Sequence, residues 1–278
     1  MRRALVGLLV PALLLLATLP ALAQGYSPDQ LFMVGKAYAN NGEDDKAIDL
    51  LGQALAGGTK SGAEAEYLLA LCLSRRDRLA EASVHLDRSL KLDPKRYDAW
   101  LLLGMTRDLS KDSAGAAEAY RRAIGLAPKR PEAHKELGVT LLMLGKPAEA
   151  VHELRLALKL KPGQPDVMGD LGYALLLDRN CEEAARILGE ARALDRKNPA
   201  LLSHLGDAQA CLGRTEAAIE AYQAALGLAP DHGRTLFHLG LMLSKKGDRP
   251  EARKALERAA ALDPENPKIK EALRRLAP

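Results

Sequence analysis

The sequence lacks the short motifs that mark common catalytic centres. No GxSxG, HExxH or Walker pattern occurs in its 278 residues, and such motifs supply a nucleophile, a zinc site or a phosphate cradle. The segment 58–61 is only superficially like a phosphate loop, because it lacks the glycine spacing and a preceding strand. Nearly all of the chain is also repetitive, which leaves no room for a separate catalytic domain. We therefore expect no enzymatic activity and no cofactor.

An excess of charge of one sign is missing as well. The chain has 40 Lys and Arg residues and 36 Asp and Glu residues. Without Arg2 and Arg3 at the N-terminus, 38 basic residues face 36 acidic ones, so the net charge is +2. The two signs are interleaved along the sequence, whereas a nucleic-acid-binding protein concentrates basic residues on one face. We expect solvated outer helix faces and no nucleic-acid partner.

Long apolar runs are absent except at the N-terminus. Residues 1–23 combine a basic start, an apolar run from Ala4 and a small-residue site ending at Ala23, which is the layout of a cleaved secretory signal peptide. The alternative is an uncleaved membrane anchor, since this apolar run is long enough to span a bilayer. Pro11, Pro20 and the small-residue site favour cleavage. We expect an exported, periplasmic protein that does not insert into the membrane after cleavage.

Residues 24–278 are dominated by copies of a 34-residue unit. In the copy 97–130, positions 4, 7, 8, 20, 24, 27 and 32 are occupied by Trp100, Leu103, Gly104, Ala116, Tyr120, Ala123 and Pro128. Position 8 is glycine in every copy but the second, at Gly35, Gly104, Gly138, Gly172, Gly206 and Gly240. Position 20 is alanine throughout, at Ala47, Ala82, Ala116, Ala150, Ala184, Ala218 and Ala252. Such agreement indicates that small side chains are required for packing.

Each copy has the pattern of two amphipathic helices joined by a short turn. In the copy 97–130, the apolar spacing predicts helices near residues 98–110 and 114–126. Small residues at positions 8, 20 and 27 let the two helices approach closely, and the proline at position 32 ends the second helix. The period and these positions resemble the tetratricopeptide repeat (TPR). The resemblance implies an all-α, right-handed superhelical solenoid.

Seven helix-turn-helix units and a C-terminal capping helix are predicted. The units span residues 28–61, 63–96, 97–130, 131–164, 165–198, 199–232 and 233–266. In the segment 267–278, Asn266 precedes the helix as its cap, Pro267 takes the first helical position, and Ile269 and Leu273 lie on one stripe. A terminal helix of this kind covers the apolar edge of the last repeat.

The TPR resemblance places ligand contacts on the concave face of the first helices, mostly at positions 2, 5, 6, 9, 12 and 13. Positions 5, 9 and 12 are largely apolar here, and large exposed apolar patches usually mark binding sites. We predict a groove that captures a peptide or protein segment, with anchors at Tyr67, Leu71, Leu101, Met105, Leu142, Tyr173 and Leu176. The alternative is that several of these side chains pack between neighbouring first helices.

Two functions are compatible with this pattern. The first is a non-enzymatic scaffold that captures a segment of a protein involved in cell-envelope, secretion or pilus assembly. The second is a structural component that tethers an envelope complex through its convex face or by self-association. The pattern leaves the oligomeric state open.

Cysteine is scarce, with only Cys72, Cys181 and Cys211. Three are too few for a disulfide framework. TPR stacking nevertheless brings the start of the second helix of the fifth unit, at Cys181, beside the end of the first helix of the sixth, at Cys211. We predict a disulfide between them in an exported protein; the alternative is two small buried apolar residues.

Histidine offers one weak indication of a metal site. His204 and His238 occupy position 6 of successive units, and Asp207 lies one turn after His204. A zinc site needs three or four ligands and a defined second shell. Ordinary polar lining is therefore the better interpretation, and we predict no metal.

Overall fold

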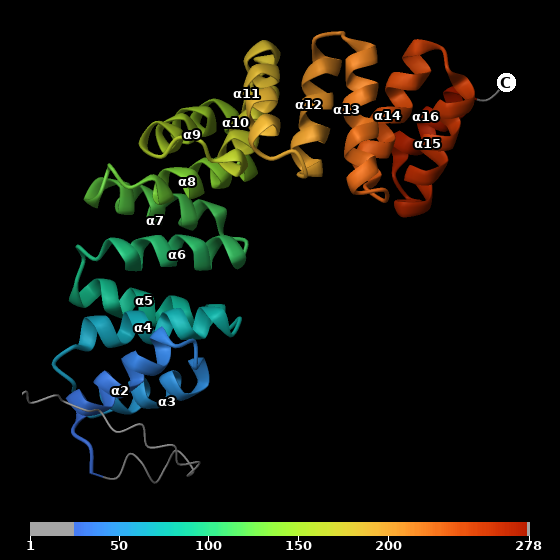
Figure 1. Cartoon of the computed structure of the whole chain (residues 1–278). Coiled ribbons are helices and arrows are strands. Elements are labelled where there is room, and N and C mark those ends of the chain that lie inside the picture. Colours follow the sequence, from blue (N-terminus) through green and yellow to red (C-terminus); the bar gives the residue numbers. More distant parts are fainter. Residues whose placement is uncertain (1–24, 277–278) are drawn as a thin grey trace, which may run out of the picture. The chain divides into compact units, whose positions relative to one another are not determined.

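The computed structural model describes residues 25–276, so the predicted signal peptide or anchor at residues 1–23 lies outside it. Between residues 25 and 276 the chain forms fifteen α-helices and no strand (Figure 1). In this range no helix combines the length and the apolar character that a membrane span requires. The predicted class, an all-α solenoid of helical repeats, is confirmed.

The helices alternate between the first and the second helix of each repeat. The first helices are α2 (Pro28–Asn40), α4 (Gly62–Arg75), α6 (Tyr97–Leu109), α8 (Pro131–Met143), α10 (Pro165–Leu177), α12 (Pro199–Cys211) and α14 (Gly233–Lys246). The second helices are α3 (Asp44–Ala56), α5 (Leu79–Leu92), α7 (Ser113–Leu126), α9 (Pro147–Leu160), α11 (Cys181–Leu194), α13 (Thr215–Leu228) and α15 (Arg249–Leu262). The last helix, α16 (Pro267–Arg275), follows α15. Helices α6 and α7 each begin one residue before the position that the sequence pattern predicts.

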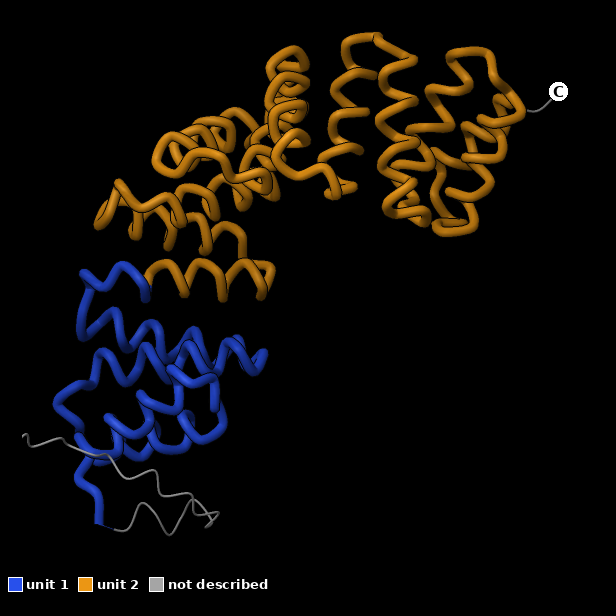
Figure 2. Tube along the Cα trace, in the orientation of Figure 1, with its two compact units in different colours: residues 1–99 blue, residues 100–278 orange. Residues whose placement is uncertain are grey.

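The chain divides into two compact units, which Figure 2 draws in different colours. The first unit is Met1–Ala99 and contains α2 to α5; the second is Trp100–Pro278 and contains most of α6 and every later helix. A hydrophobic core cluster in the second unit runs from Ala116 in α7 to Ala221 in α13. A second cluster runs from Ala218 in α13 to Leu276 after α16. Each cluster spans several neighbouring helices, as the cores of stacked repeats do.

Glycine at position 8 is required by the contact between the two helices of a repeat. A Cβ atom on Gly138 in α8 would lie 2.6 Å from Cγ of the fully buried Leu154 in α9, far inside van der Waals distance. At Gly104 in α6, a Cβ atom would overlap the ring of Tyr120 in α7. The alanines at position 20 are fully buried, at Ala47, Ala82, Ala116, Ala150, Ala184, Ala218 and Ala252. The paired helices pack closely because these side chains are small.

Among the polar side chains that cap helix starts in the second unit, three lie in its C-terminal half. Asn198, Asp248 and Asn266 accept hydrogen bonds from backbone N–H groups in the first turns of α12, α15 and α16. These N–H groups have no partner within the helix, so each cap stabilises its helix by about 1 kcal/mol. Of these three helices, α12 also lines the candidate site described below.

Candidate functional site

The first helices of the second unit form a surface that we call the inner face. A hollow of about 380 Å³ opens on it between α10, α12 and α14. Its apolar wall consists of Tyr173, Leu176, Leu177, Leu241 and Met242. We call this hollow the inner pocket. Its size and its apolar wall suit one large apolar side chain of a bound segment.

The structure brings together only part of the predicted anchor set. Tyr173 and Leu176 line the inner pocket. Three of the predicted anchors are half-buried and pack against the core, at Leu101, Leu142 and Leu176. These leucines therefore contribute partly to packing, which was the alternative to a role in ligand binding. Met105 is 42% exposed on α6. The two remaining anchors, Tyr67 and Leu71, are half-buried on α4 in the first unit.

One carboxylate, Asp207 on α12, organises the polar side of the inner pocket. It accepts hydrogen bonds from the Tyr222 hydroxyl at 2.8 Å, from Nδ1 of His238 at 2.6 Å and from the Arg234 guanidinium at 2.8 Å. Burial alone would raise the pKa of Asp207, but the His238 contact, the Tyr222 hydrogen bond and the charge of Arg234 outweigh it and hold that pKa below its usual value. Asp207 is therefore an ionised hub that ties α12 to α13 and α14.

An aromatic stack lies beside this hub. The ring of Tyr173 stacks on His204 at a centroid distance of 4.9 Å, and the Arg234 guanidinium lies 5.4 Å from the centre of the Tyr173 ring. Burial lowers the pKa of His204, so its imidazole is neutral at pH 7. Nδ1 of His204 is buried and has no hydrogen-bond partner among the described residues. His238 thus lines the pocket, whereas His204 contributes by stacking on the pocket residue Tyr173.

The candidate metal ligands of the sequence were His204, His238 and Asp207. Within residues 25–276, no group of three His, Cys, Asp or Glu side chains is placed to hold a metal ion. His238 and Asp207 instead bond to each other.

The sequence reasoning missed two members of the pocket that its own family pattern indicates. Leu177 occupies position 13 and Arg234 position 2 of their repeats, and both positions belong to the contact set of TPR proteins. The anchors predicted from the sequence occupy positions 5, 9 and 12 alone. The signal for both residues was therefore present in the repeat register.

The structure joins Cys181 and Cys211 by a disulfide, with the two Cα atoms 6.1 Å apart. The bridge connects the start of α11 to the end of α12, and Cys211 also lines the inner pocket. The third cysteine, Cys72 in the first unit, is buried with a free thiol, and burial raises its pKa to about 12. A thiol of this kind is protonated and unreactive at pH 7.

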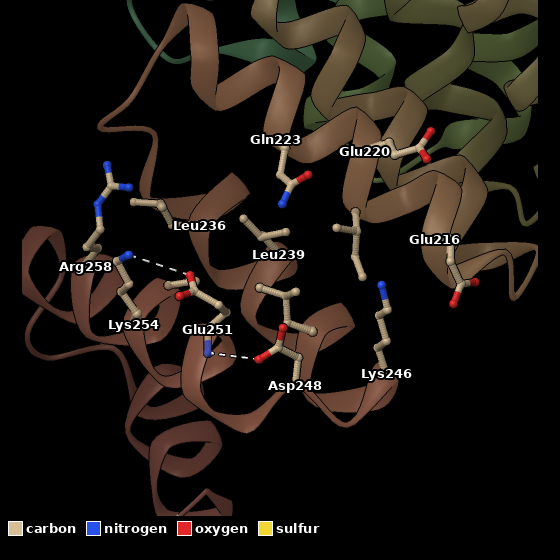
Figure 3. Close-up of a pocket in the computed structure, with 13 residues that line it drawn as sticks. Glu216, Glu220, Gln223, Leu236, Leu239, Lys246, Asp248, Glu251, Lys254 and Arg258 are labelled. Atoms are coloured by element: carbon tan, nitrogen blue, oxygen red, sulfur yellow. Dashed lines mark hydrogen bonds and ion pairs between the residues drawn. The ribbon is translucent and has the colours of Figure 1, made fainter.

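A second hollow, of about 450 Å³, lies on the side of the second helices, between α13 and α15. In Figure 3, Glu216 and Glu220 project from α13, and Lys254 and Arg258 project from α15 across Leu239. We call this the outer hollow. Its rim carries charges of both signs over an apolar floor, unlike the apolar wall of the inner pocket.

Comparisons with solved structures show the same fold in several proteins. One chain of the APC/C hetero-tetramer Cut9–Hcn1 is 20% identical over 93% of this chain and 51% of that chain, with a TM-score of 0.65. This chain therefore spans about half the length of that one. The type IV pilus biogenesis factor PilW is 19% identical over 76% of this chain and 98% of its own, with a TM-score of 0.66. YrrB, a TPR protein with an unusual peptide-binding site, is 17% identical over 68% and 97%, with a TM-score of 0.56.

Family models give a more specific result than these distant structures. No curated protein matches the chain. Models of the tetratricopeptide repeat match residues 85–131, 110–165, 141–206 and 199–265, which together cover 85–265 without a gap. The matched range contains every helix from α6 to α15 and the inner pocket. The chain belongs to the tetratricopeptide repeat family.

Proposed function

We propose that this protein is a non-enzymatic scaffold that captures a segment of another protein on its inner face. The observation that carries the proposal is the inner pocket, a hollow with an apolar wall on the face formed by the first helices. Leaving Tyr173, Leu176 and Leu177 in contact with water is unfavourable, and burying one leucine side chain contributes about 1.5–3 kcal/mol. A bound apolar side chain supplies that burial.

The likeness to other TPR proteins supports this proposal. YrrB is a TPR protein with a peptide-binding site, and PilW is a pilus biogenesis factor. We further propose that this protein acts in the cell envelope after export, because the N-terminal segment 1–23 has the layout of a signal peptide. Retention of that segment as a membrane anchor is the alternative.

Selection from a phage-displayed peptide library on the purified protein tests capture. The informative variant is Leu177→Asp, which places a charge in the wall of the inner pocket. The matched control is Leu228→Asp at the end of α13, outside the pocket, because Leu177 and Leu228 are 46% and 47% exposed. We expect selected peptides to bind the wild type and Leu228→Asp equally and Leu177→Asp at least about tenfold more weakly. Equal binding to all three proteins would rule out the inner pocket as the site.

The outer hollow favours a second candidate function, the structural tether. Its charged rim over the Leu239 floor has the mixed character of a protein–protein contact surface. A tether of this kind predicts that Glu220→Lys together with Arg258→Glu abolishes association with an envelope complex or with a second copy, while Leu177→Asp leaves it intact. Analytical ultracentrifugation and co-purification of the tagged protein measure both forms of association.

A further inference from the structure

The inner face of the third to fifth repeats carries an exposed apolar strip. It lies at the C-terminal ends of α6, α8 and α10, where Leu109, Met143 and Leu177 occupy position 13 of successive repeats. These side chains are 64%, 58% and 46% exposed. Leu177 also belongs to the wall of the inner pocket, so strip and pocket are continuous. An apolar row that recurs from helix to helix in this way is typical of a docking surface.

Nearer the N-terminal ends of α8 and α10, the same face is acidic. Nζ of Lys135 lies 3.9 Å from Oε1 of Glu136 and 3.3 Å from Oδ2 of Asp166. Besides burial, the negative charges of both carboxylates raise the pKa of Asp170. Burial raises the pKa of Glu136, and burial likewise raises that of Asp170 to about 6. One ammonium group is therefore not enough to compensate for three carboxylates, and additional cations on a ligand would be stabilised here.

The distance between the two features fits one kind of ligand. Asp170 and Leu177 are seven residues apart on α10, which is about 10 Å along a helix axis and close to the width of an α-helix. An amphipathic helix laid across the first helices reaches the acidic group with one edge and the apolar strip with the other. Seven residues of that ligand also advance about 10 Å, which matches the spacing of packed helices.

We propose that the inner face of the third to fifth repeats binds a cationic amphipathic helix of a partner protein, with Lys or Arg against Glu136 and Asp170 and apolar side chains on the strip. This inference rests on the proposed capture function and specifies the chemistry of the captured segment. Heptad spacing of the cationic and apolar residues in the ligand brings them opposite successive repeats.

Two synthetic peptides test the inference. The first is an amphipathic helix of Leu and Lys, and the second has every Lys replaced by Glu. Fluorescence anisotropy measures binding of each peptide to the wild type, to Leu177→Asp and to two double variants. The first double variant is Glu136→Gln with Asp170→Asn. The second is a control with the same change in net charge, Glu118→Gln with Glu182→Gln, at exposed positions of α7 and α11 outside both hollows. Far-UV circular dichroism of each variant verifies equal helix content.

The inference predicts that the Lys peptide binds and the Glu peptide does not, and that the inner-face double variant binds the Lys peptide about tenfold more weakly while the control is unchanged. If both double variants bind the Lys peptide equally more weakly than the wild type, the loss follows from the change in net charge alone, and the inference is overturned. Equal binding of the Lys and Glu peptides, with loss in Leu177→Asp, would overturn it while leaving the proposed capture function standing. If neither peptide binds, the cationic-helix inference is wrong, and the library selection alone decides whether the inner face captures another kind of segment.

Discussion

Gly138 provides the strictest test of how the repeats pack. This glycine lies on α8 against α9, and a Cβ atom there would lie 2.6 Å from Cγ and 2.9 Å from Cδ2 of Leu154. Leu154 is fully buried, and the clash falls on its branch point, so rotation about χ2 does not relieve it and a different χ1 rotamer would have to fit into the filled core. Overpacking of this kind lowers the free energy of unfolding by about 1–3 kcal/mol, while the better helix propensity of alanine raises it by up to about 1 kcal/mol. Gly138→Ala is therefore expected to destabilise the protein by about 1–2 kcal/mol.

A double-mutant cycle separates this contact from general effects of the substitution. Leu154→Ala alone is expected to cost about 2–5 kcal/mol through loss of burial and the cavity that remains. In the Gly138→Ala background the new methyl group has room, so the same truncation is expected to cost about 1–2 kcal/mol less. A coupling energy near zero would show that the two residues are not in the contact that the structure describes.

The control for this experiment is Gly189→Ala on α11. A Cβ atom at Gly189 meets no other atom within 4 Å, so alanine is expected to stabilise the helix by up to about 1 kcal/mol. Urea unfolding followed by far-UV circular dichroism measures all five proteins, with the slope of the transition compared to verify similar cooperativity. The packing account is refuted if Gly138→Ala is as stable as the wild type, or if Gly189→Ala is the more damaging of the two alanine variants.

Three further predictions concern the second unit. Replacing both Cys181 and Cys211 by serine removes a covalent link between residues 30 apart in sequence, so we expect the free energy of unfolding to fall by about 2–4 kcal/mol. Mass spectrometry of the alkylated wild type with and without reductant checks that the bridge exists. Two free thiols in the oxidised protein would contradict the bridge. Burial raises the pKa of Asp170 from an ordinary value of 3.8 to about 6, so the folded state binds this proton more tightly than the unfolded state. The stabilising contribution of this residue is therefore complete below pH 4 and is lost as the pH rises through 6. Asp170→Asn is therefore expected to be more stable than the wild type at pH 7, by up to about 3 kcal/mol, with the difference vanishing near pH 4; urea titrations at both pH values measure it, and equal stability at pH 7 would contradict the burial of this carboxylate. Asn266→Ala removes the cap of α16 and is expected to cost about 1 kcal/mol, visible as faster amide exchange in α16 than in α15; unchanged exchange would show that packing alone holds this helix.

The fold was predictable from the sequence because its packing depends on the size of a few recurring side chains. Gly104 and Gly138 leave space for Tyr120 and Leu154 in the paired helix, and this requirement repeats every 34 residues, so it is visible without any structure. The pairing of Cys181 with Cys211 was likewise expected from repeat stacking alone.

The inner pocket was less predictable, because it depends on contacts between repeats rather than within one. Tyr173 and Leu176 were expected on this face. Their neighbour Arg234, however, belongs to the seventh repeat, two repeats further along the chain. The three hydrogen bonds to Asp207 converge from α13 and α14, and a single-repeat pattern carries no information on how their side chains point. The apolar residues at position 13 were predictable, because Leu109, Met143 and Leu177 recur at the same place in successive repeats.

Site-specific photo-crosslinking in the cell tests whether a cationic amphipathic segment lies on the inner face. A photoreactive amino acid is introduced at Leu177 in one strain and, as the matched control, at Leu228 in another, and the crosslinked peptide is sequenced by mass spectrometry. We expect an adduct at position 177 but not at 228, with the attached segment carrying Lys or Arg beside apolar residues at heptad spacing. Adducts at position 228 alone, or an acidic segment at position 177, would show that no cationic helix binds this face.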